Sequence, residues 1–112
     1  MIDHAAVPRP GSENRLVIAG RLAGRPELRV SPAGVPIVTF GLAHESEQPE
    51  AEGKRSVRFV VRVRAAGKDT CERLMGLSAG TAVTVYGYLA PSPPRFNDHK
   101  LVISARRIEI RE

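Results

Sequence analysis

The chain has 112 residues, with 17 Lys and Arg against 12 Asp and Glu, for a net charge of +5. This length fits one domain and excludes most enzymes that carry a separate cofactor domain. The basic balance points only weakly to a polyanionic partner, because a solvated surface explains it equally well. The single Cys71 fits a reducing cytoplasm, and no apolar run reaches the roughly 18 residues of a membrane span. The N-terminus has no hydrophobic stretch typical of a signal peptide.

Residues 1–13 contain Pro8, Pro10 and Gly11 and show no periodicity, so we predict a flexible N-terminal segment followed by one domain over 14–112. Alternation of apolar and polar residues then predicts strands. The predicted strands are 14–22, 37–44, 57–64, 81–89 and 101–110, with a short continuation over 27–30. The only predicted helix is 68–75, and Gly76 ends it. Polar loops are predicted over 45–54 and 91–100.

The same alternation predicts which strand residues face the core. These are Leu16, Ile18, Gly20, Leu22, Val38, Phe40, Leu42, Val57, Phe59, Val61, Val63, Val83, Val85, Gly87 and Leu89. Gly20 and Gly87 lie inside strands, where glycine marks a bulge or a sharp bend.

Five strands with one helix between the third and the fourth is the layout of the OB-fold, a small all-β barrel. That fold binds oligonucleotides through strands 2 and 3 and the loops joining strands 1–2 and 4–5. An SH3-like barrel is the alternative, but it does not call for a helix at this position.

Side chains that would support catalysis are scattered. The histidines, His4, His44 and His99, are far apart, and one cysteine cannot form a Cys/His metal set. There is no phosphate-binding loop, dinucleotide fingerprint or nucleophile elbow. We therefore expect a protein that is not an enzyme and uses no cofactor or metal. Cys71 is expected to be a packing residue.

The strongest signal is a basic cluster in and before the third strand. Its members are Lys54, Arg55, Arg58, Arg62 and Arg64, with no acid among them. On a strand, alternate arginines lie roughly 7 Å apart, which is comparable to the phosphate spacing of a single strand. We therefore predict nucleic-acid binding here. The alternative is a solvated face, or pairing with the glutamates of 45–52.

A second cluster lies in the loop over 91–100, where Arg95, Phe96 and Lys100 place two cations beside an aromatic ring. Phe96 could stack on a base or fold back onto the barrel end. A third, weaker cluster is Arg21, Arg25 and Arg29, around the first turn.

Tyr86 and Tyr88 are expected to point outward from the fourth strand, where they could stack on bases or line a dimer interface.

Several motifs resemble the primosomal replication protein N (PriB) family. They are the run 14–20, Arg25-Pro26, Leu28-Arg29, the Ser-Pro-x-Gly-x-Pro turn at 31–36, then Phe40, Leu42 and His44, and later Gly80, Val83, Val85, Gly87 and the ending 101–110. The resemblance covers 14–110. It implies a homodimeric OB-fold that binds single-stranded DNA and the primosomal helicase PriA, and in some bacteria DnaT, during the restart of stalled replication forks.

The resemblance also implies DNA contacts at particular positions. Arg29 matches a basic residue before the Ser-Pro turn, and Arg95 and Lys100 keep positive charge in the late loop. Arg58 stands where well-studied members carry tryptophan. Glu45 stands where a basic residue is expected, and Pro93 replaces a lysine. We therefore expect DNA binding that is weaker or differently distributed.

Three functions remain open from the sequence. The first is a single-stranded DNA-binding component of the restart primosome. The second is a general single-stranded DNA-binding protein, which the ending at Glu112 without an acidic tail disfavours. The third is a protein-interaction adaptor with weak or no DNA affinity.

Overall fold

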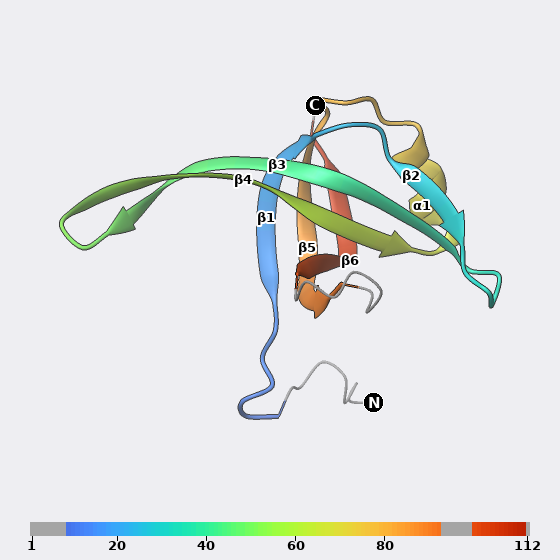
Figure 1. Ribbon diagram of the computed structural model, residues 1–112, viewed down its shortest axis with the longest axis horizontal. Coiled ribbons are helices and arrows are strands. Elements are labelled where there is room, and N and C mark those ends of the chain that lie inside the picture. The colour runs from blue at the N-terminus through green and yellow to red at the C-terminus, as the bar shows by residue number, and fades with distance from the viewer. Residues whose placement is uncertain (1–8, 93–99, 112) are drawn as a thin grey trace.

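The computed structural model describes residues 9–92 and 100–111. Figure 1 shows the arrangement of the strands and the helix. The elements are β1 (Leu16–Leu22), β2 (Glu27–Val30), β3 (Pro36–Glu50), β4 (Gly53–Ala66), α1 (Lys68–Met75), β5 (Ala82–Pro91) and β6 (Leu101–Ile110). The predicted helix is confirmed with the same bounds. Among the described residues, no helix is long and apolar enough to cross a membrane.

The sheet closes on itself as a five-stranded barrel. Its strands follow the order β1-β5-β6-β4-β3, and β3 returns to β1 through the pairs Arg21↔Ala43 and Leu22↔Leu42. The β4–β6 pair is parallel and the others are antiparallel. The short β2 pairs with β3 along the edge opposite β4. This topology confirms the predicted OB-fold.

The barrel core consists of the inward residues of each strand. Its buried members are Leu22, Val38, Phe40, Leu42, Val63, Ala65, Cys71, Leu74, Val83, Val85, Ile103 and Ile108. Two predicted core residues are largely exposed: Phe59 keeps 41% of its surface and Leu89 keeps 40%. Phe59 lies at the edge of the barrel, opposite His44 on β3 and one position beyond the last pair between β1 and β3. Val57, also predicted to face the core, is only half-buried and is not part of the core. Leu89 shares a face with buried Ile103 but sits near the β5–β6 end, where the packed core stops.

Two strand glycines lie where another backbone segment leaves no room for a side chain, and the predicted bulge is found beside Gly87. A Cβ atom on Gly20 would meet the carbonyl oxygen of Ala43, at the point where β1 meets β3. A Cβ atom on Gly87 would meet the carbonyl oxygen of Ser104, beside the register shift between β5 and β6. Glycine is thus required where the barrel turns its corners.

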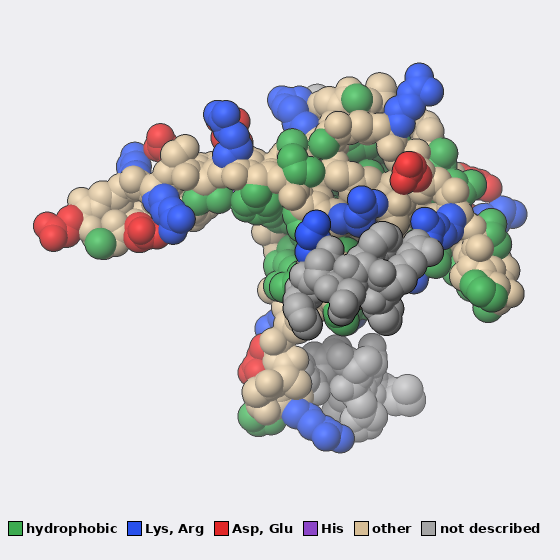
Figure 2. All heavy atoms as spheres, viewed as in Figure 1, with side chains coloured by type: hydrophobic (Ala, Val, Ile, Leu, Met, Phe, Trp, Pro, Cys, Tyr) green, Lys and Arg blue, Asp and Glu red, His purple; other side chains and the backbone are tan. Residues whose placement is uncertain are grey.

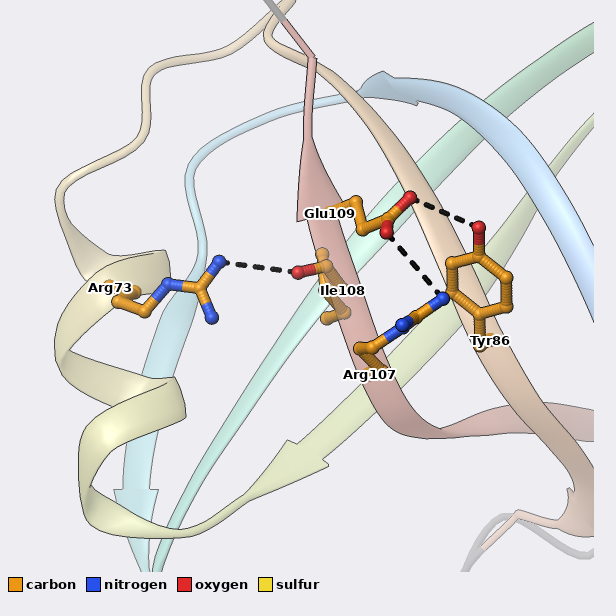
Figure 3. A network of polar contacts seen from close by, with 5 residues as sticks. All are labelled: Arg73, Tyr86, Arg107, Ile108 and Glu109. Carbon is orange, nitrogen blue, oxygen red and sulfur yellow. Dashed lines mark hydrogen bonds and ion pairs between the residues drawn. The ribbon is translucent and has the colours of Figure 1, made fainter.

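The helix α1 packs against β3 and β4. It follows Gly67, whose φ of 111° favours glycine, and buries Cys71 and Leu74. Arg73 joins the helix to β6, since its Nη2 donates to the Ile108 carbonyl over 3.2 Å (Figure 3). Burial raises the pKa of the Cys71 thiol. Cys71 is therefore a packing residue, as predicted.

The predicted polar loop over 45–54 is wrong, because β3 and β4 continue through this segment as a paired ribbon. The register runs without interruption from Ile37↔Ala66 to Glu50↔Gly53, and Ala51 turns the chain with a φ of 51°. Residues 45–58 project from the barrel as an arm (Figure 1). The segment carries opposite charges rather than an apolar face, so it lacks the pattern by which the other strands were predicted.

Candidate nucleic-acid interface

The outer face of β4 carries Arg58, Val60, Arg62 and Arg64, as the alternation predicts. Arg62 stands opposite Gly41 and Arg64 stands opposite Thr39 on β3. Because these cross-strand neighbours on β3 are small, the side chains of Arg62 and Arg64 are both exposed. Neither Arg62 nor Arg64 makes a hydrogen bond or ion pair with the residues that the structure describes. Their charges are therefore available to an anionic ligand.

The other three cations of this cluster lie on the arm and are paired with glutamates. The shortest contacts are Arg58 to Glu45 and Arg55 to Glu50, both at 3.3 Å. Lys54 approaches Glu47 at 3.9 Å. All these side chains are exposed, so each pair stabilises the arm by only about 0.2–1 kcal/mol. The pairing alternative raised from the sequence thus holds for the arm but not for Arg62 and Arg64.

A hollow opens beside the unpaired arginines, where β4 and β6 separate. The two strands pair only at Val63↔Ile103 and Arg64↔Ser104, so they part before these positions. The hollow has a volume of about 400 Å³. It is lined by Gly41, Val60, Val61, Arg62, Ser92, Lys100, Leu101 and Val102. This size lies within the range of small-molecule sites.

The base of the β5–β6 connection forms one rim of the hollow. The backbone N–H and the hydroxyl of Ser92 both donate to the Lys100 carbonyl, over 2.9 and 2.8 Å. These bonds hold Lys100 on the rim, with Arg62 elsewhere in the lining. The predicted Arg95 and Phe96 lie outside the described residues, so their role stays a prediction.

The cations of the first turn do not join this surface as one cluster. Arg29 is exposed on β2, while the Nη1 atom of Arg21 donates to the Gly80 carbonyl over 3.1 Å. Glu27 pairs with Thr39, which in turn pairs with Arg64, so an acidic residue lies in the same cross-strand row as Arg64.

The tyrosines of β5 are engaged by the arginines of β6. The guanidinium carbons of Arg107 and Arg106 lie 4.1 and 5.1 Å from the ring centroids of Tyr86 and Tyr88. The Tyr86 hydroxyl donates to Glu109 over 3.0 Å, and Arg107 pairs with the same carboxylate at 3.5 Å (Figure 3). One face of each ring is therefore covered within the chain.

Six lining residues were not predicted as site residues: Gly41, Val60, Val61, Ser92, Leu101 and Val102. Val60 and Leu101 expose 65% and 54% of their surface. Val60 interrupts the outward row of arginines, and this interruption is the sequence signal that could have identified it. Figure 2 shows Lys and Arg side chains gathered on the barrel in the centre of the view, whereas basic and acidic side chains intermingle along the arm.

The fold and this basic face define a class of protein, and comparison with known proteins agrees with it. The model of the family described as "Another single-strand binding protein family" matches residues 14–107. The wild-type single-stranded DNA binding protein from Thermus aquaticus superposes with a TM-score of 0.75 at 25% identity, over 89% of this chain and 50% of that chain.

Relatives with higher sequence identity show which family within this class the chain belongs to. The replication restart protein PriB of Erwinia tasmaniensis is 34% identical over 97 residues, which are 87% of this chain and 92% of the relative. The solved structure of the PriB protein from Ralstonia solanacearum gives a TM-score of 0.74 at 31% identity, covering 88% of this chain and 99% of that one. The chain belongs to the PriB family of replication restart proteins, within the single-strand binding proteins.

Proposed function

We propose that this chain binds single-stranded DNA without sequence preference, as a component of the replication-restart primosome. The observation that carries the proposal is the exposed Arg62 beside the hollow, with Arg64 next in the outward row of β4. A groove with positive charges spaced along a strand can follow a flexible phosphate backbone. The PriB relatives support the place of this binding in replication restart. That role implies a cytoplasmic location.

Single strands are favoured over duplex on geometric grounds. Sequence readout in the major groove needs a helix or a two-stranded ribbon that enters the groove. The helix α1 spans eight residues and packs against β3 and β4, so it is not free to enter DNA. The arm is a two-stranded ribbon, but its cations are paired with glutamates.

The protein partners proposed are the helicase PriA, which the family resemblance implies, and DnaT in bacteria that use it. A homodimer is proposed as well. The edge of β1 over Leu16–Gly20 pairs with β5 on one side and has no strand on the other among the described residues. Such an edge is stabilised when a second chain covers it. Light scattering at tens of micromolar should give a dimer mass, and a monomer mass would refute this part of the proposal.

A second function is favoured by one observation. Arg58 occupies the position where well-studied family members carry tryptophan, and Glu45 holds its guanidinium. This arrangement fits an adaptor that binds its protein partners with little DNA affinity.

Fluorescence anisotropy separates the two functions. Labelled oligo-dT and a duplex of equal length are titrated with the chain at several salt concentrations. DNA binding predicts tighter association with the single strand and a linear loss of log affinity with log salt. Tighter binding to duplex contradicts the proposal. Absence of binding to either, with retained binding to PriA, establishes the adaptor function instead.

A further inference from the structure

We infer that the hollow between β4 and β6 is a slot for one unstacked nucleobase, gripped by aliphatic side chains. The inference rests on the proposed single-strand binding and deepens it by separating base contacts from phosphate contacts. Among the described residues that line the hollow, none is aromatic. The described lining therefore offers a base contact with aliphatic side chains.

The walls of the slot come from the two strands that part. Val60 is exposed on the outer face of β4, and Leu101 is exposed at the start of β6. Large apolar side chains that line a hollow on a charged surface are the unusual feature here, since isolated exposed apolar residues are common but a built apolar slot is not. A flat base would exclude water from both side chains at once.

Gly41 opens the slot from the β3 side. A Cβ atom at this position would come within 3.3 Å of a Val60 methyl group, so any larger residue would push Val60. Gly41 also stands directly opposite Arg62 across the β3–β4 ladder. The missing side chain leaves room for a ring beside the arginine.

Charges at the edge of the slot would hold the phosphates of the same nucleotide and its neighbour. Arg62 and Lys100 both belong to the lining and lie on different strands. Guanidinium and ammonium groups suit phosphate oxygens. The neighbouring arm, with its glutamates, adds little net attraction. The slot therefore combines aliphatic side chains with cationic ones, which matches the base and the phosphate of a nucleotide unit in a single strand.

The test compares two probes on the same protein. Oligo-dT and an oligomer of equal length and charge with abasic residues are titrated with the full chain. We expect wild-type protein to bind oligo-dT about fivefold more tightly than the abasic probe, equivalent to about 1 kcal/mol, because a base in the slot would remove apolar surface of Val60 and Leu101 from water. The salt slope should be the same for both probes, because they carry the same phosphates.

The variant Val60→Ser with Leu101→Ser should lose most of this preference and keep the affinity for the abasic probe. Met75→Ser is the control, since Met75 on α1 is an exposed apolar side chain that neither lines the hollow nor lies on the edge of β1 proposed for the dimer. Equal binding of both probes by wild type overturns the slot and leaves single-strand binding intact. An equal loss for both probes in the double variant also overturns it. Failure of wild type to bind either probe refutes the proposed function itself.

Cross-linking gives a second measurement that needs no variant. Oligo-dT carrying a photoreactive thymine analogue is irradiated with wild-type protein, and the attached peptide is identified by mass spectrometry. Attachment within 60–62 or 100–102 is expected. Attachment confined to the arm or to β2 contradicts the slot.

Discussion

Arg58 and Glu45 face each other across the two strands of the arm, and Nη2 of the arginine donates to the carboxylate over 3.3 Å. The pair lies just beyond the barrel, next to the outward row that continues to Arg62. It separates a basic cluster that is continuous in the sequence into two parts. On the arm the cations are balanced by glutamates, and on the barrel they are not.

Removing this pairing should release Arg58 for DNA. Glu45→Gln is expected to raise affinity for oligo-dT about two- to fivefold, because an exposed ion pair is worth about 0.2–1 kcal/mol and the freed guanidinium can take a phosphate. Arg58→Gln alone should change affinity by less than about twofold. In the Glu45→Gln background the same change should reverse the gain. A double-mutant cycle by anisotropy measures this coupling. If the effects of the two substitutions on the binding free energy are strictly additive, the ion pair with Glu45 does not keep Arg58 from contacting DNA.

Arg62 should contribute more than the arm cations. Arg62→Gln is expected to weaken oligo-dT binding and to lower the slope of log affinity against log salt by about 0.7, the value for one lost contact to a single strand. Arg55→Gln is the matched control on the arm and should leave the slope unchanged. Both residues are exposed, so unfolding free energies should change by less than about 0.5 kcal/mol. A larger slope change for Arg55→Gln than for Arg62→Gln would place the DNA on the arm.

The barrel should depend on Gly87 for the close packing of β5 against β6. In Gly87→Ala the new methyl group would clash with the Ser104 carbonyl oxygen, a backbone atom that cannot rotate away. Overpacking of this kind costs about 1–3 kcal/mol, and each kcal/mol lowers the Tm of a domain this size by roughly 4–8 °C. Gly53→Ala is the control, since nothing lies within 4 Å of its added Cβ. Thermal unfolding followed by circular dichroism measures both, and equal Tm values would contradict the close approach.

Cys71 should be unreactive in the folded chain. Its side chain is 3% exposed, and burial raises the pKa of the thiol above its ordinary value of 9.0. Native protein should react slowly with a thiol reagent and rapidly after unfolding. The folded state keeps the proton when the unfolded chain has lost it. The contribution of the Cys71 thiol to the free energy of unfolding is therefore fully present below pH 9 and decreases as the pH rises above 9. Fast labelling of native protein at neutral pH would refute this burial.

Strand and core positions could be predicted wherever one face of a strand is buried. Val38, Phe40 and Leu42 alternate with less buried residues because β3 packs on the core there. The same physical cause explains the failure beyond His44. The arm has no core to face, so its strands are held by a ladder of hydrogen bonds and by pairs such as Glu45 with Arg58. Its alternation is one of charge, which a search for apolar periodicity does not detect.

The basic part of the candidate site could be predicted from local spacing, but the hollow could not. The hollow exists because β4 and β6, strands distant in sequence, begin their pairing only at Val63 and Ile103. Where two non-adjacent strands part depends on the closure of the whole barrel. Gly41 and Leu101 meet only through that closure, so local patterns do not indicate their roles.

The central claim is that single strands bind on the barrel face around the hollow and not on the arm. A titration of isotope-labelled chain with oligo-dT, followed by the backbone amide resonances in NMR spectra, tests it residue by residue. Binding at the hollow predicts the largest shifts within 60–64 and 100–102, with small shifts over 47–55. Largest shifts on the arm, or no shifts at oligonucleotide concentrations well above that of the protein, would contradict the account.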